Sequence, residues 1–107
     1  MSIVPSPRPR RDLVPPDVSR AVDVAQLLGD RSRATILAML ADGPHCVCEF
    51  AIALGARQSN VSNHLARLRQ AGLVRSTRHE ANGRLQYYER DEAAVEAART
   101  ALSTLLR

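Results

Sequence analysis

Aromatic residues are scarce in this chain, which has no tryptophan and only Phe50, Tyr87 and Tyr88 among its 107 residues. Proteins that bind single-stranded nucleic acid stack the bases on several aromatic side chains. Three aromatics do not provide such a platform. If the chain binds a nucleic acid, the composition therefore favours a double helix.

Long hydrophobic runs are also missing. No apolar stretch approaches the ~20 residues that cross a bilayer. Three prolines interrupt residues 1–11, where a secretory signal would need an apolar segment. The sequence therefore predicts a cytoplasmic protein that does not bind a membrane.

Patterns typical of catalytic sites are absent as well. The chain has no glycine-rich phosphate loop and no H-E-x-x-H motif. No serine or cysteine has a histidine and a carboxylate that the predicted fold would bring beside it. We expect no enzymatic activity and no organic cofactor.

Positive charge is concentrated in one third of the chain. The net charge is +4, and residues 55–90 hold seven arginines against two glutamates, whereas every other part is close to neutral. A basic block of this kind favours a polyanionic partner. With 107 residues there is room for one domain and a small core, so burial against a second subunit is plausible.

The order of apolar stripes and breakers predicts a mainly helical fold with a two-stranded β-wing. Five prolines within residues 1–16 predict a flexible, Pro- and Arg-rich arm without regular structure, followed by one domain over residues 17–107. The expected order is α-α-α-α-β-β-α. The elements are a helix from Asp17 to Gly29, a helix capped by Asp30 and stopped at Gly43-Pro44, helices Cys46–Leu54 and Ser59–Ala71, strands Val74–His79 and Leu85–Arg90 around Asn82-Gly83, and a helix over Asp91–Arg107.

The third and fourth helices, joined by a tight turn near Gly55, form the pattern of a helix-turn-helix. Amide and hydroxyl side chains that cluster near the start of the fourth helix are of the types that read base edges, and arginines suit phosphates. The candidate DNA-binding residues are Gln58, Ser59, Asn60, Ser62, Asn63, His64, Arg67, Arg78 and Arg84. The alternative is that this is only the solvated face of a surface helix.

Taken together, these segments resemble the ArsR/SmtB family of metal-sensing winged-helix repressors over residues 20–107. The resemblance is carried by Asp30-Arg-Ser-Arg33, Cys46-Val-Cys48-Glu-Phe, the run 58–65, the run 68–74, Gly83-Arg84 and Tyr87-Tyr88. It implies a winged helix-turn-helix homodimer, paired through its first and last helices, that binds an inverted repeat in operator DNA. The family usually has serine where this chain has Arg57, so Ser59 is expected to cap the fourth helix.

Cys46 and Cys48 are the only cysteines. In a cytosolic protein such a pair is more often metal-binding or redox-active than a structural disulfide, although two small core residues are the plain alternative. Residues two apart on an intact helix point about 200° apart, so both sulfurs can meet one ion only if the first turn distorts or has not yet formed. We therefore expect ligand binding to reshape this helix. The resemblance implies an inducer site at these two positions.

The number of available donors narrows the choice of inducer. Zn(II), Cd(II) and Pb(II) favour about four ligands in a closed site, and the N-terminal arm, which supplies two thiolates in some relatives, has no cysteine here. Two thiolates suit As(III) or Sb(III), including a methylated trivalent arsenical. Some relatives have a third cysteine at the position of Ala51, and His45 is a weaker candidate for a third ligand. The family's other common metal site lies on the last helix. Of the ligands of that site, this chain has only the one at Asp91.

The sequence thus predicts a homodimeric repressor of arsenic-resistance genes that releases operator DNA when As(III) or Sb(III) binds Cys46 and Cys48. The alternatives are a repressor that uses the same cysteines to respond to thiol oxidation or to Cd, Pb or Zn. A protein-interaction module with core cysteines is the remaining possibility.

Overall fold

The structure is a computed structural model that describes residues 6–78 and 86–107. Its main elements, in chain order, are α1 (Val18–Leu28), α2 (Arg31–Met39), β1 (His45–Cys46), α3 (Val47–Leu54), α4 (Gln58–Gln70), β2 (Val74–Arg78), β3 (Gln86–Arg90) and α5 (Glu92–Ser103). Short 3-10 turns cover Arg11–Leu13 and Leu40–Asp42. The winged helix-turn-helix predicted from the sequence is confirmed.

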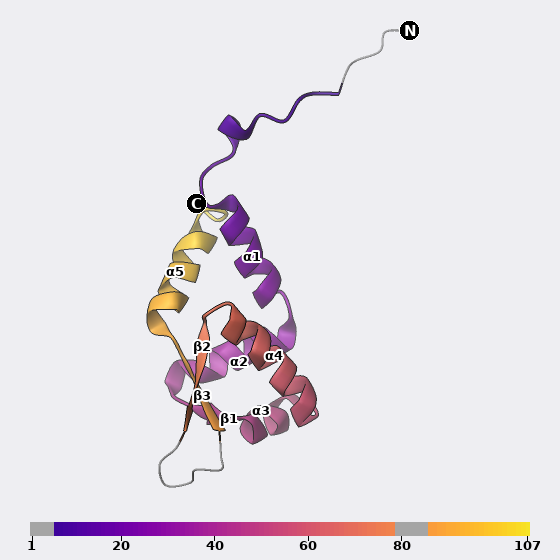
Figure 1. The fold of residues 1–107 in the computed structure, drawn as a ribbon, viewed down its shortest axis with the longest axis vertical. Coiled ribbons are helices and arrows are strands. Elements are labelled where there is room, and N and C mark those ends of the chain that lie inside the picture. Colours follow the sequence, from indigo (N-terminus) through magenta and orange to yellow (C-terminus); the bar gives the residue numbers. More distant parts are fainter. Residues whose placement is uncertain (1–5, 79–85) are drawn as a thin grey trace.

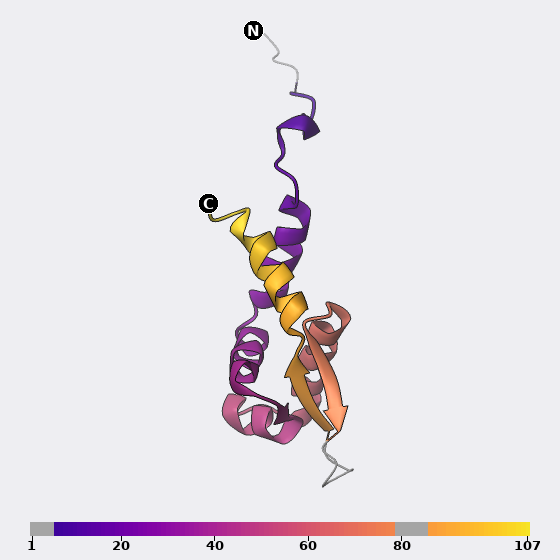
Figure 2. The ribbon, with the colours of Figure 1, turned by 90° about the vertical axis from the view of Figure 1, so that its left-hand side faces the viewer.

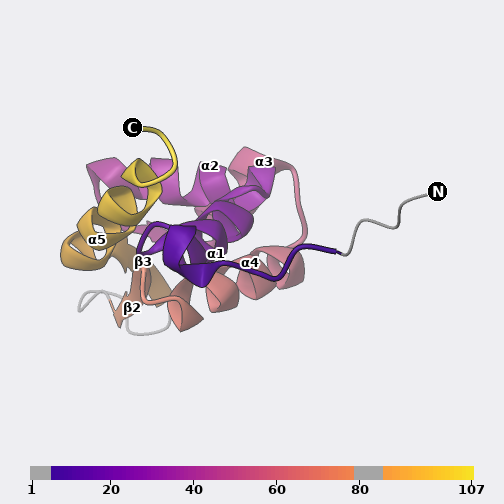
Figure 3. The same cartoon turned by 90° about the horizontal axis from the view of Figure 1, so that it is seen from above.

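The helices form two groups, visible in Figure 1. α2, α3 and α4 pack together beside the sheet, whereas α1 and α5 pack against each other at the other end of the molecule. Figure 2 shows α5 continuing from the end of β3 toward α1. Seen from above in Figure 3, the N-terminal segment leads away from the helices, and residues 6–17 are all exposed.

The sheet has three strands in the order β1-β3-β2, rather than the two predicted. His45 and Cys46 pair antiparallel with Tyr88 and Tyr87, so β3 is the central strand. The extra strand is only two residues long, which is too short for an alternating pattern in the sequence. The predicted Asn82-Gly83 turn lies outside the described residues.

Capping residues define most helix boundaries. Asp30 and Asp91 accept hydrogen bonds from the backbone N–H groups of Arg33 and Ala94, each at 3.0 Å, and so cap α2 and α5. Gly55 ends α3 at φ +61°, a left-handed conformation that suits glycine, and this makes the tight turn into α4. The arm contains one turn that the sequence analysis did not predict, Arg11–Leu13, where three residues between prolines can still form i to i+3 bonds.

The core lies between α2, α3, α4 and the sheet. Its largest fully buried side chains are Phe50, Ile36, Leu65, Leu68 and Val61. On α1 the apolar residues at helical spacing, Val18, Ala21, Val22, Ala25 and Leu28, predict the inner face. This prediction is partly wrong, because Val22 and Ala25 are exposed while Val24 and Leu27 pack against the core. No helix among the described residues is long and apolar enough to cross a membrane.

Phe50 and Ile52 give a matched test of this packing. Both are large apolar residues on α3, but Phe50 is fully buried and Ile52 is 83% exposed. Phe50→Ala should lower the free energy of unfolding by about 3–5 kcal/mol, through lost burial and the cavity that remains. Ile52→Ala should change it by less than about 0.5 kcal/mol. Urea denaturation followed by circular dichroism measures both, and equal losses would contradict the described position of α3.

Candidate nucleic-acid interface and cysteine site

α4 presents a polar face opposite its buried stripe. Val61, Leu65 and Leu68 face the core because they recur at spacings of four and three. The exposed residues include six of the predicted DNA contacts: Gln58, Ser59, Asn60, Ser62, Asn63 and Arg67. These side chains come from one helix and are available to a ligand.

The start of α4 differs from the prediction. Arg57, not Ser59, occupies the N-cap position, with an extended backbone (φ −71°, ψ 146°) and no side-chain cap bond. Ser59 therefore lies in the first helical turn. Because no side chain caps this end, the position of α4 depends on packing.

The remaining predicted contacts are placed differently. His64 is half-buried on the side of α4 that faces the start of α2. Arg78 is the last residue of β2, toward the tip of the wing. Arg84 lies outside the described residues.

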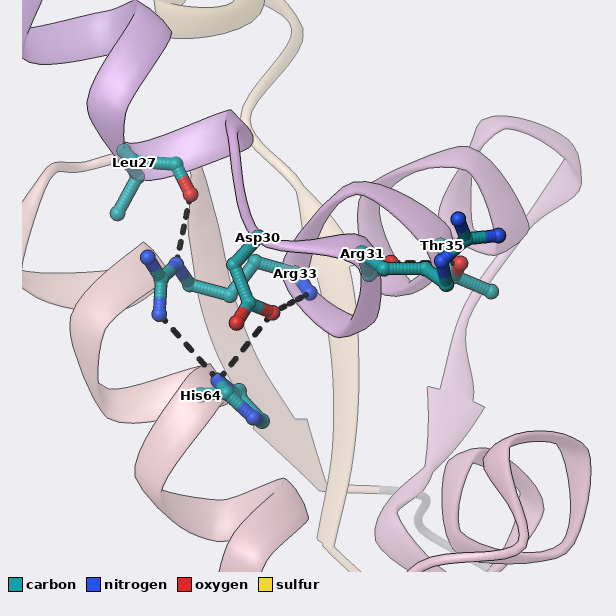
Figure 4. A network of polar contacts seen from close by, with 6 residues as sticks. All are labelled: Leu27, Asp30, Arg31, Arg33, Thr35 and His64. Atoms are coloured by element: carbon teal, nitrogen blue, oxygen red, sulfur yellow. Dashed lines mark hydrogen bonds and ion pairs between the residues drawn. The ribbon is translucent and has the colours of Figure 1, made fainter.

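A polar network that the sequence analysis missed joins α1, α2 and α4 (Figure 4). The Arg33 Nε donates to the Leu27 carbonyl at 2.6 Å, and its Nη1 lies 3.4 Å from His64 Nδ1. Asp30 Oδ1 lies 3.9 Å from the same nitrogen. Arg33 and His64 are 31 residues apart, so no local sequence pattern could reveal this contact.

Charge pairing leaves part of the basic block free. Arg75 pairs with Glu89 at 2.7 Å and Arg90 with Glu92 at 3.2 Å, which offsets their charge. Within the described residues, no carboxylate lies within 4.0 Å of Arg67 or Arg69 on α4. The unpaired positive charge of the described block therefore includes the outer side of this helix.

Cys46 and Cys48 lie together at the start of α3, where their sulfurs form a disulfide in this structure. Their Cα atoms are 5.4 Å apart. The predicted helix start at Cys46 is wrong by one residue, because α3 begins at Val47. The two sulfurs meet by the second route that the sequence allows, since the first turn has not yet formed at Cys46. Cys46 is the extended N-cap residue (φ −88°, ψ 163°), so the two sulfurs meet without distortion of the helix.

A carboxylate holds the backbone next to this pair. Glu49 Oε1 accepts from the Cys46 backbone N–H at 3.0 Å, and its Oε2 lies 2.9 Å from His45 Nδ1. The backbone N–H of Cys46, followed by the His45 side chain, lowers the pKa of Glu49 below its usual range. The Nδ1 atom of His45, the weaker candidate for a third ligand, is therefore engaged by Glu49.

Other metal sites find little support in the described residues. Within residues 6–78 and 86–107, no group of three or more His, Cys, Asp or Glu side chains could hold a metal ion. The carboxylate of Asp91 caps α5 and lies 3.7 Å from Arg75 Nη1. Cys46 and Cys48 are thus a two-donor site in the described part of the chain.

The cysteine pair is adjacent to the sheet of the wing and to the helix that packs on α4. Cys46 lies in β1 opposite Tyr87 of β3 in the wing, and Cys48 lies on α3, which packs against α4. A change in the separation of the two sulfurs therefore acts on α3, on β3 or on both.

Comparison with known proteins agrees with this fold. The profile described as "Bacterial regulatory protein, arsR family" matches residues 30–76, from the cap of α2 into β2. The chain is 38% identical over 80 residues to the Arsenic resistance transcriptional regulator ArsR1 of Pseudomonas putida. These 80 residues cover 74% of this chain and 56% of that protein. It spans little more than half the length of the curated relatives it matches.

Two solved structures extend the comparison over most of the domain. One is entitled "Possible transcriptional regulator for arsenical resistance" (TM-score 0.71, 26% identity, 79% of this chain and 85% of that chain). The other is reduced HlyU from Vibrio cholerae (TM-score 0.63, 31% identity, 81% of this chain and 90% of that chain). The chain belongs to the arsR family of bacterial regulatory proteins.

The charge on Glu49 should make the cysteine site sensitive to acid. Because the pKa of Glu49 is lowered in the folded protein, its contribution to stability is present above the unfolded value, about 4.3, and disappears as the pH falls through the folded pKa. Glu49→Gln keeps an acceptor for the Cys46 N–H but cannot titrate. Urea midpoints measured at neutral pH and near pH 3 should differ more for the wild type than for this variant. Equal losses would show that the carboxylate does not hold the start of α3.

Proposed function

We propose that this chain is a homodimeric transcriptional repressor that binds operator DNA when free and releases it when As(III) or Sb(III) binds Cys46 and Cys48. The single observation that carries this proposal is the position of the cysteine pair. Its two sulfurs lie within bonding distance of each other at the junction of β1 and α3, next to the helix that would read DNA. The likeness to a regulator named for arsenic resistance supports the choice of inducer.

Duplex DNA is the partner that best suits the exposed face of α4. A helix enters the major groove with its polar end toward the base edges, and amides such as Asn60 and Asn63 pair with adenine. The unpaired guanidinium groups of Arg67 and Arg69 suit the flanking phosphates. In a two-fold dimer, two such helices require an inverted repeat with half-sites about one helical turn apart.

Dimerisation is supported by an apolar surface on α1, on α5 and on the residues that follow α5. Leu106 is 81% exposed, Leu105 and Val22 are also exposed, and an apolar hollow of about 500 Å³ lies between α5 and α2. A large apolar patch of this kind is typical of an interface. We infer that the same surface of a second copy covers it, through the first and last helices.

Binding of the metalloid requires the dithiol form of the pair. Arsenite, As(OH)₃, would exchange two hydroxides for the two thiolates. Each thiol proton leaves with a hydroxide as water, and the third hydroxide stays on arsenic. A methylated trivalent arsenical would have carbon in that third position. Soft thiolate ligands favour such ions over magnesium or calcium.

The energy needed for release is modest. To weaken DNA binding a hundredfold, the metalloid must favour the DNA-incompetent arrangement by ~2.7 kcal/mol. Cys46 lies in the strand paired with β3, and α3 packs on α4. A displacement at the pair can therefore reach both the wing and the recognition helix.

A redox response of the same pair is the second candidate, because the structure contains the Cys46–Cys48 disulfide. A peroxide would oxidise the two thiols to this disulfide and be reduced to water, and a cellular thiol would reverse the step. One related structure is described as that of the reduced protein, which supports this candidate. Both candidates assign the protein to the cytoplasm, where the thiols are kept reduced.

Single serine substitutions test the inducer site. Cys46→Ser and Cys48→Ser should each bind DNA with an affinity near that of the wild type but no longer release it with arsenite, because one thiolate cannot chelate the ion. Fluorescence anisotropy on the DNA upstream of the chain's own gene measures both properties, with antimonite, zinc, cadmium and peroxide in parallel. Release of either variant at the wild-type arsenite concentration would disprove the two-cysteine site. Release by peroxide alone would favour the redox candidate.

Asn63 tests the reading of bases. Asn63→Ala should weaken binding to the cognate site by about 1–3 kcal/mol and change binding to random duplex little, because a base contact discriminates between sequences. Arg84→Ala is the control, and it should weaken both by similar amounts if Arg84 contacts phosphate. Equal losses on both duplexes for Asn63→Ala would remove this residue from the base-reading set.

A further inference from the structure

Two polar hollows flank the exposed face of α4. The hollow on the α2 side has a volume of about 350 Å³ and is lined by Arg33, Asn60, Asn63, His64 and Arg67. The hollow on the sheet side, about 440 Å³, includes Arg69 and Tyr88. Asn63 lies between these two flanks, opposite the buried stripe of the helix.

The dimensions of DNA place a phosphate backbone along each flank. An α-helix with its side chains is about 10–12 Å across, and the major groove is about 12 Å wide. A helix in the groove therefore has one strand's phosphates on each side. If α4 enters the groove, the α2-side hollow faces one of these backbones.

The guanidinium of Arg33 is fixed in a position that suits a phosphate. Its Nε donates to the Leu27 carbonyl and its Nη1 to His64 Nδ1, which leaves three of its five N–H groups without a partner among the described residues. No carboxylate in residues 6–78 and 86–107 lies within 4.0 Å of this group. Because the side chain is already held, little conformational entropy is lost when it binds a phosphate.

His64 has a positioning role in this arrangement. A guanidinium can only donate hydrogen bonds, so in this contact Arg33 is the donor and Nδ1 of His64 is the acceptor. His64 thereby holds Arg33 toward the hollow that also contains Arg67. Asp30, the nearest carboxylate to this ring, does not line the hollow and is engaged as the cap of α2.

We propose that Arg33, together with Arg67, forms a phosphate-binding site for the DNA backbone on the α2 side of the recognition helix. This inference rests on the DNA binding proposed above and adds a contact from a helix outside the helix-turn-helix. It also divides the proposed DNA contacts into two kinds. Asn63 reads bases, whereas Arg33 and Arg67 fix the position of the helix without regard to sequence.

The salt dependence of binding to random-sequence duplex tests the site, because each phosphate contact contributes a slope of about −0.9 to log K against log salt. With two sites per dimer, Arg33→Ala should reduce the magnitude of the slope by about 1.8. Arg31→Ala is the matched control. Arg31 is an exposed arginine two residues earlier on α2 that does not line the hollow, and its loss removes the same charge. The control should change the slope by less than about 0.5.

Two further variants separate binding from folding. Arg33→Lys keeps the charge, so its slope should match that of the wild type. Arg33→Gln removes the charge but can still donate to the Leu27 carbonyl, so it should show the reduced slope even if Arg33→Ala does not fold. A wild-type slope in Arg33→Gln, or equal slopes in the Arg33 and Arg31 variants, would overturn the phosphate site. Failure of the wild type to bind any duplex at about 50 mM salt would instead overturn the proposed function.

Discussion

The recognition helix depends on the packing of its apolar stripe. α4 is 13 residues long, has no side-chain cap at its start and carries many polar residues, so it would be marginal as an isolated helix. Val61, Leu65 and Leu68 are fully buried in the same cluster as Ile36 of α2 and Phe50 of α3. The direction of its polar face is therefore set by α2 and α3. Any displacement of Phe50 changes the surface that α4 presents.

This dependence explains why a site at the start of α3 can regulate a surface on α4. Cys48 lies on the helix that carries Phe50, only two residues away along the chain. Cys46 belongs to the strand that pairs with Tyr87 of β3. In a domain of this size, the ligand site, the recognition helix and the wing share one core, so no separate relay is needed between them.

Local patterns predicted most of the fold. The stops at Gly43 and Gly55 and the cap at Asp30 could be predicted because each acts within one turn of its own helix. Contacts between distant segments could not be predicted in this way. The strand at His45 pairs with residues more than 40 positions later, and Arg33 meets His64 across 31 residues. On α1, apolar residues lie on more than one side of the helix, so the sequence alone does not show which side faces the core. In the structure, Val24 packs against the core and Val22 is exposed.

The largest change from the sequence prediction came from a single boundary residue. With Cys46 on the helix, the two thiols would diverge, and ligand binding would have to break the first turn. With Cys46 as the N-cap, the sulfurs meet while Glu49 still holds the Cys46 N–H. Both sulfurs can therefore act together without unwinding of α3.

The two candidate signals place different demands on this geometry. The disulfide coexists with complete α3 and α4 helices and with the pairing of β1 and β3, so oxidation does not require these elements to separate. A metalloid bound to both thiolates is inserted between the sulfurs and must hold them farther apart than a direct bond does. The two side chains, or a movement of β1 relative to α3, must accommodate that separation. Because oxidation consumes the same thiols, it also blocks the metalloid. In the proposed function, oxidation therefore competes with the metalloid for the same two thiols.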